Sequence, residues 1–121
     1  MTDKARRYVE ETVAYLEKHY SEPLKSADLA ARLGISRSYL ARLMQEYSDL
    51  SVMEWLRNIR LEHGHEMLLS TDKSITEIAR NVGYRDPAAF SKYFRDRYGT
   101  SPSDYRSLHS NSKKSPLQVD I

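Results

Sequence analysis

The chain has 121 residues, 19 Lys and Arg against 17 Asp and Glu, no Cys and a formal net charge of +2. This length fits one compact domain or two very small ones, and 40% hydrophobic with 30% charged residues is typical of a soluble, helix-rich protein. The absence of Cys excludes a disulfide scaffold and a thiolate zinc site. Because no apolar run approaches the roughly 20 residues of a membrane span and the start carries no secretory signal, we expect a cytoplasmic protein that does not use a membrane.

The first half of the chain is predicted to hold three helices and the start of a longer one. Apolar residues at three- and four-residue steps indicate an amphipathic helix over residues 4–20. Two shorter helices follow, with expected N-caps at Ser26 and Ser36, and Gly34 is the C-terminal stop between them. A longer helix is expected over residues 51–69.

The second half is predicted to add three short helices. Their expected N-caps are Ser74, Asp86 and Ser101, and the last helix ends near residue 108. Residues 109–121 show no periodicity and are interpreted as a flexible tail. Since no stretch has the alternation of a strand, the sequence predicts an all-α fold with seven helices.

An internal repeat of roughly 50 residues relates the two halves. Leu29-Ala30-x-x-Leu33-Gly34-Ile35 parallels Ile78-Ala79-x-x-Val82-Gly83-Tyr84. A small residue where two helices cross, a glycine in the turn and an apolar residue that locks the second helix inward are the requirements of a helix-turn-helix, and both copies meet them. The repeat therefore predicts two helix-turn-helix subdomains, residues 4–50 and 71–108, joined by a connecting helix over 51–70.

Packing should leave one side of the second helix exposed in each copy. The exposed residues are Ser38, Ala41, Arg42 and Gln45 in the first copy and Ala88, Ser91, Lys92 and Arg95 in the second. Small residues allow close approach, and the longer side chains are donors suited to guanine edges or phosphate oxygens. Neither set contains an acidic or a large apolar residue, so the pattern favours nucleic-acid binding.

The second copy continues this pattern into a long motif. It reads Ser74-Ile75-x-Glu77-Ile78-Ala79-x-x-Val82-Gly83-Tyr84-x-Asp86-Pro87-x-x-Phe90-Ser91-Lys92-x-Phe94-Arg95-x-x-Tyr98-Gly99-x-Ser101-Pro102-x-x-Tyr105-Arg106. With this motif, residues 4–108 resemble the DNA-binding domain of AraC/XylS-type bacterial transcription regulators. The resemblance implies a sequence-specific regulator, most simply an activator, that places two recognition helices in successive major grooves of an asymmetric double-stranded DNA site.

The resemblance also implies site residues. Base contacts are expected from Arg37, Ser38, Arg42, Gln45, Ala88, Ser91 and Lys92, and phosphate contacts from Ser36, Ser74 and Arg95. The expected partners are double-stranded DNA and RNA polymerase, with no cofactor. We expect a monomer on DNA if the chain acts alone, and a dimer through an N-terminal domain if it belongs to a longer regulator.

Other functions are less well supported by the sequence. Glu62-x-x-His65 has the spacing of helical metal sites, but the chain lacks the partner Glu/His set, so we expect neither a metal site nor an enzyme. The alternative function is a helix-turn-helix module used mainly for docking on another protein, with weak DNA readout.

Two residues and the charge distribution depart from a simple repeat. Asp49 stands where the family and the second copy have glycine, so its turn is expected to be strained or differently shaped, and Gly64 inside the connecting helix should cost about 1 kcal/mol. Residues 73–106 hold seven basic and four acidic residues, a local +3, whereas residues 50–72 hold two basic and four acidic ones, a local −2. The second copy is therefore the expected electrostatic anchor on DNA.

Overall fold

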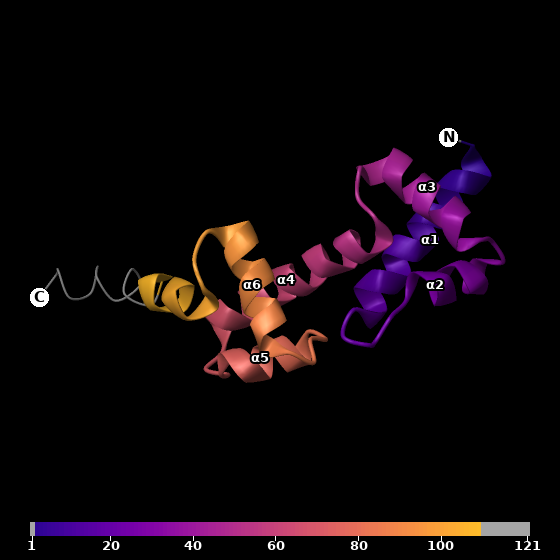
Figure 1. Cartoon of the computed structure of the whole chain (residues 1–121). Coiled ribbons are helices and arrows are strands. Elements are labelled where there is room, and N and C mark those ends of the chain that lie inside the picture. The colour runs from indigo at the N-terminus through magenta and orange to yellow at the C-terminus, as the bar shows by residue number, and fades with distance from the viewer. Residues whose placement is uncertain (1, 110–121) are drawn as a thin grey trace, which may run out of the picture. The chain divides into compact units, whose positions relative to one another are not determined.

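The computed structural model describes residues 2–109, which form seven helices and no strand (Figure 1). This confirms the predicted all-α fold. Apart from residue 109, which is helical, the expected tail lies outside the described residues. The chain divides into two compact units, Met1–Arg60 (the first unit) and Leu61–Ile121 (the second unit), with the boundary inside the long helix. In the described part of the chain, no helix is both long enough and apolar enough to cross a membrane.

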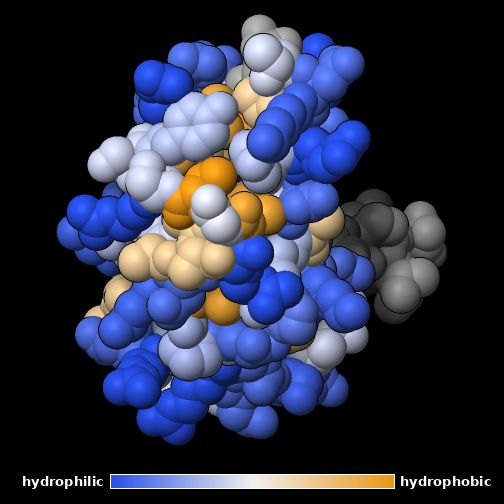
Figure 2. Space-filling view, turned by 90° about the vertical axis from the view of Figure 1, so that its right-hand side faces the viewer, coloured by the Kyte–Doolittle hydropathy of each residue, from blue (hydrophilic) through white to orange (hydrophobic). Residues whose placement is uncertain are grey.

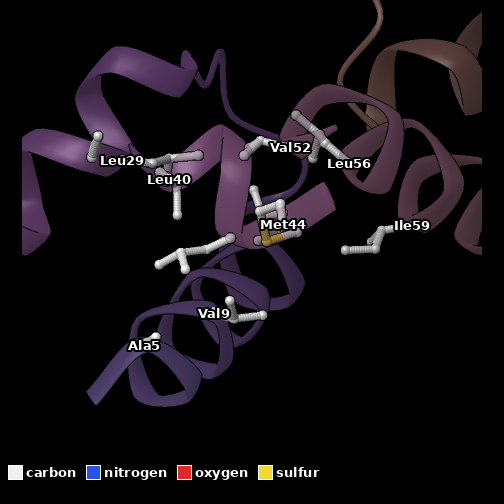
Figure 3. Packing of buried hydrophobic residues seen from close by; sticks show 11 residues of the cluster. Ala5, Val9, Leu29, Leu40, Met44, Val52, Leu56 and Ile59 are labelled. Atoms are coloured by element: carbon white, nitrogen blue, oxygen red, sulfur yellow. The ribbon is translucent and has the colours of Figure 1, made fainter. Parts of the chain in front are cut away.

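The first unit consists of α1 (Asp3–His19), α2 (Ser26–Leu33), α3 (Arg37–Ser48) and the start of α4 (Val52–Ser70). Helix α3 packs against both α1 and α2. Side chains from all four helices meet in one core, among them Val9, Leu29, Leu40, Met44 and Leu56, each at most 3% exposed (Figure 3). Burial of one side of α3 leaves its other side exposed to solvent.

The second unit consists of the rest of α4, α5 (Ile75–Asn81), α6 (Pro87–Tyr98) and a helix over residues 102–109. Phe90 and Phe94 of α6 are fully buried. Gly64 of α4 makes room for the first of these rings, because a Cβ at this position would lie 2.6 Å from Cε1 of Phe90. The glycine therefore has a packing role, which offsets the lower helix stability that glycine causes inside a helix.

Main-chain hydrogen bonds repeat between the two helix-turn-helix turns. In the first unit, the Gly34 N–H donates to the Ala31 carbonyl at 3.1 Å and the Ile35 N–H to the Ala30 carbonyl at 3.1 Å. In the second unit, the Gly83 N–H donates to Arg80 at 3.1 Å and the Tyr84 N–H to Ala79 at 2.9 Å. The four residue pairs are related by the 49-residue spacing found in the sequence, so the repeat extends to the backbone geometry of the turns.

The ends of α3 and α6 also match. Asp49 has φ +60° and its N–H donates to the Gln45 carbonyl at 2.9 Å, while Gly99 has φ +86° and its N–H donates to Arg95 at 2.8 Å. The turn at Asp49 therefore has the same left-handed form as its glycine counterpart, and the strain of that form falls on a residue with a side chain.

The helix caps agree with the sequence at all but one position. Ser36 accepts a hydrogen bond from the Tyr39 N–H, Ser74 from the Glu77 N–H and Asp86 from the Ala88 N–H, at 3.0 to 3.1 Å. The predicted cap at Ser26 is wrong, because α2 begins at Ser26 and its N-cap is Lys25, which makes no side-chain cap. The N-cap position is the same in both copies of the repeat: the 49-residue spacing makes Lys25 the counterpart of Ser74, which is the N-cap of α5.

Two arginines hold the chain segments that lead into α2 and α5. In the first unit, Arg60 donates from Nε to the Tyr20 carbonyl at 2.7 Å and from Nη2 to the Glu22 carbonyl at 2.8 Å. In the second unit, Arg106 donates to the carbonyls of Leu68, Thr71 and Lys73, at 3.0, 3.1 and 2.6 Å. Each guanidinium thus binds one carbonyl at the end of a helix, Tyr20 or Leu68, and further carbonyls of the segment that follows that helix.

Candidate nucleic-acid interface

Helix α3 presents one exposed side in the first unit. Its opposite side is held by Leu40, Leu43 and Met44, which are buried. The predicted base-contact residues Arg37, Ser38, Arg42 and Gln45 are all exposed, as is Ala41. At 100° per residue these five positions fall within roughly 140° of the helix surface, so the structure brings them to one side of α3.

Helix α6 presents the corresponding side in the second unit. Ala88, Lys92 and Arg95 are exposed, and Ser91 is half-buried. Together with Asp96 these four residues line a shallow surface hollow of about 630 Å³. The residues selected from the sequence therefore form one continuous surface. Asp96 was missed, although its position one turn after Lys92 could have revealed it.

On α3, the guanidinium of Arg42 lies between an acidic and an aromatic side chain of the same helix. Nε of Arg42 lies 3.9 Å from Oε1 of Glu46, and the guanidinium lies 5.1 Å from the ring centroid of Tyr39. The Arg42 and Glu46 side chains remain 68% and 54% exposed. Glu46 was not predicted as part of the site, because it lies just outside the part of the helix surface that the predicted contact residues occupy.

The two serines expected at phosphates cap their own helices. A serine hydroxyl that accepts from the backbone still has a proton to donate to a phosphate oxygen. At Ser74, however, the carboxylate of Glu77 accepts from the Ser74 N–H at 3.3 Å and completes a capping box. The pKa of Glu77 is lowered, mainly by the hydrogen bond from the Ser74 backbone and next by the one from the Ser74 side chain. A negative charge therefore lies beside this candidate phosphate contact.

Fewer basic side chains of the second copy are available to DNA than the residue count indicates. Arg97 pairs with Glu62 at 3.3 Å, and Arg106 is directed at backbone carbonyls of its own unit. The expected anchor therefore depends on the remaining basic residues: Lys73, Arg80, Arg85, Lys92 and Arg95.

The residues of the metal-like motif have other partners. Glu62 pairs with Arg97, and Nε2 of His65 lies 2.9 Å from the Tyr105 hydroxyl. Within residues 2–109 no group of three His, Asp or Glu side chains is placed to hold a metal ion.

The first unit turns a largely hydrophilic surface to the viewer in Figure 2, with a small group of apolar side chains at its centre.

Two helix-turn-helix units, each with small and cationic side chains on the exposed side of its second helix, define a DNA-binding protein of the helix-turn-helix class. Comparison with known proteins gives the family.

The chain belongs to the AraC/XylS family of DNA-binding transcription regulators. A family model described as a helix-turn-helix domain matches residues 29–107. The raffinose operon transcriptional regulatory protein RafR of Pediococcus pentosaceus is 39% identical over 94 residues, which are 78% of this chain and 34% of that protein. The lactose operon transcription activator of Staphylococcus xylosus is 33% identical over 106 residues, 88% of this chain and 38% of that protein.

A solved structure supports the same assignment. The DNA-binding domain of AdpA, a global transcriptional factor crystallised with a target DNA, is 29% identical and superposes with a TM-score of 0.82 over 88% of this chain and 96% of that one. The present chain spans little more than a third of the two curated relatives. It therefore corresponds to only a part of those proteins.

Proposed function

We propose that this chain is a sequence-specific regulator that inserts α3 and α6 into successive major grooves of an asymmetric double-stranded DNA site. The observation that carries the proposal is the surface hollow on α6, because Ala88, Ser91, Lys92 and Arg95 line it together. The exposed side of α3 supplies the matching residue types. The similar DNA-binding domain of AdpA was crystallised in complex with a target DNA, which supports the same kind of partner for this chain.

The length of α4 supports a site of about two helical turns. This helix has 19 residues, which at 1.5 Å per residue is about 28 Å. One turn of B-DNA measures about 34 Å, so the connector is of a size that suits two readers in neighbouring grooves.

We assign the contacts within this proposal as follows. Arg42 and Lys92 read guanine edges, where their donors match the O6 and N7 acceptors. Arg37, Ser38, Gln45, Ala88 and Ser91 lie around them and complete the base-contact surfaces, and Arg95, Ser36 and Ser74 contact phosphates.

Activation is a further part of the proposal. We expect contact with RNA polymerase through the acidic side of α4 or through the surface of the first unit, where Tyr47 is 51% and Met53 40% exposed. One relative is named a transcription activator, in agreement with this role. Acting alone, the chain would bind its site as a monomer; joined to a sensory domain, it would bind as a dimer through that domain.

Selection of binding sites from random duplex DNA tests the proposal. The expected result is an asymmetric site with two blocks of preferred bases, and log K that falls with log salt concentration by about 0.9 per phosphate neutralised. Arg42→Ala and Lys92→Ala should each cost about 1–3 kcal/mol and relax the preference in one block only. Absence of binding to any duplex at low salt would contradict the proposal and favour a protein-docking module.

A further inference from the structure

The repeat places an acidic residue at the same position on both recognition helices. Glu46 of α3 and Asp96 of α6 are 50 residues apart, the spacing that also relates Arg42 to Lys92. Each acid follows its cation by four residues, so the two side chains lie on the same side of their helix. The outer surface of each helix therefore carries a cation and, one turn later, an anion.

The helix macrodipole does not account for these acids. Glu46 lies two residues before the end of α3, and Asp96 two residues before the end of α6. A negative charge in the last turn of a helix opposes the helix macrodipole, which favours cations there. Both acids are exposed, so core packing does not require them either.

In the first unit the geometry shows which part of the cation the acid faces. Oε1 of Glu46 lies 3.9 Å from Nε of Arg42. The terminal Nη1 and Nη2 atoms of a guanidinium form a fork that matches O6 and N7 of guanine. The carboxylate therefore faces the nitrogen that lies behind this fork. In the second unit, Asp96 is the acidic residue among those that line the hollow with Lys92.

We propose that Glu46 and Asp96 are specificity-determining residues that direct Arg42 and Lys92 to base edges by opposing contact with phosphates. A phosphate carries a full negative charge, so a carboxylate beside the cation weakens the attraction between that cation and the DNA backbone. Guanine O6 and N7 are uncharged acceptors, and the same carboxylate weakens their contact less. The inference rests on the proposed function, because it assumes that both helices face DNA.

Neutralising each acid tests the inference. Glu46→Gln and Asp96→Asn are compared with the wild type for binding to the selected site and to a random-sequence duplex across a salt series. Affinity for the random duplex should rise about two- to fivefold, the range expected for one exposed ion pair. Affinity for the selected site should rise less, so the ratio of the two falls, and the salt slope on the random duplex should become steeper by up to about 0.9.

The control is Glu11→Gln, an exposed α1 residue whose loss of charge is the same. Circular dichroism melting verifies that all three variants fold. A specificity ratio that stays at the wild-type value, or that changes equally in the control, would overturn the inference. A lower ratio caused only by weaker binding to the selected site would also overturn it, because the acid would then bind a base amino group. If the wild type selects no site, the proposed function fails first, and that result is distinct.

Discussion

At Asp49 the backbone adopts a conformation that a side chain makes costly. The residue has φ +60° and ends α3, where a carboxylate also opposes the helix macrodipole. We expect Asp49→Gly to stabilise the first unit by about 1 kcal/mol through relief of this strain. Part of that gain is offset because glycine gives the unfolded chain more conformational entropy. Urea unfolding followed by the fluorescence of Trp55, the single tryptophan, measures the change.

Asp49→Asn separates the two causes, because asparagine removes the charge and keeps a side chain at the same φ. If charge dominates, Asn should give most of the gain that Gly gives; if backbone strain dominates, it should give little. A glycine variant that is no more stable than the wild type would show that the aspartate fits this turn without strain.

Within the second unit, Arg106 connects the last helix to the end of α4 and to the segment before α5. Its three hydrogen bonds to carbonyls require the planar fork of a guanidinium. We expect Arg106→Lys to lose about 2–4 kcal/mol of stability although it keeps the positive charge. Arg106→Met, which removes the charge, should leave the salt slope of DNA binding unchanged. A slope that is shallower by about 0.9 in this variant would show that Arg106 is a phosphate contact instead.

The contact of His65 with the last helix predicts a pH dependence. Nε2 of His65 lies 2.9 Å from the Tyr105 hydroxyl, and its ring stacks on Tyr98 with centroids 4.7 Å apart. Burial, followed by the positive charges of His109 and Arg97, lowers the pKa of His65 below its ordinary value of 6.5. Of these two charged groups, Arg97 lies on α6 and His109 on the last helix.

Because the folded second unit prefers neutral His65, the stability due to this preference is fully present above pH 6.5 and is lost as the pH falls from there through the lower pKa that His65 has in the folded state. Melting temperatures of the wild type at pH 7.5 and 5.5 should therefore differ more than those of His65→Gln. Equal pH dependence in the two proteins would assign the effect to other groups.

Helix positions were predictable because apolar spacing and caps are local signals. The cap of α2 was misplaced because Ser26 is a good capping residue by type, and only alignment with the second copy points to Lys25. Arg60 and Arg106 were not predictable as anchors, since they bind backbone carbonyls 33 to 40 residues away and leave no periodic pattern. For the site, spacing selected the other residues of the α6 hollow, but Asp96 was missed because an outward acid resembles an ordinary solvated charge, and only its place one turn after Lys92 sets it apart.

For the whole molecule, the presence of two units predicts two steps of unfolding. Ala79 of α5 is fully buried, so Ala79→Leu should overpack the second unit and destabilise it by about 1–3 kcal/mol. Circular dichroism should then lose part of its helical signal before the fluorescence of Trp55, which packs on the core of the first unit, changes. Coincident transitions would show that α4 couples the units into one cooperative fold. Affinity for DNA should fall with the first step.

The arginine anchors also determine where the chain tolerates change. Arg60 and Arg106 bind carbonyl oxygens, which every residue type provides, so the side chains of the held segments are left open to variation. Ser21 and Asp72, in or beside these segments, are exposed. Because the chain has no cysteine, one introduced at either position would be the single attachment point for a fluorescent or spin label. A label there would report on its unit while the recognition helices keep their native surface.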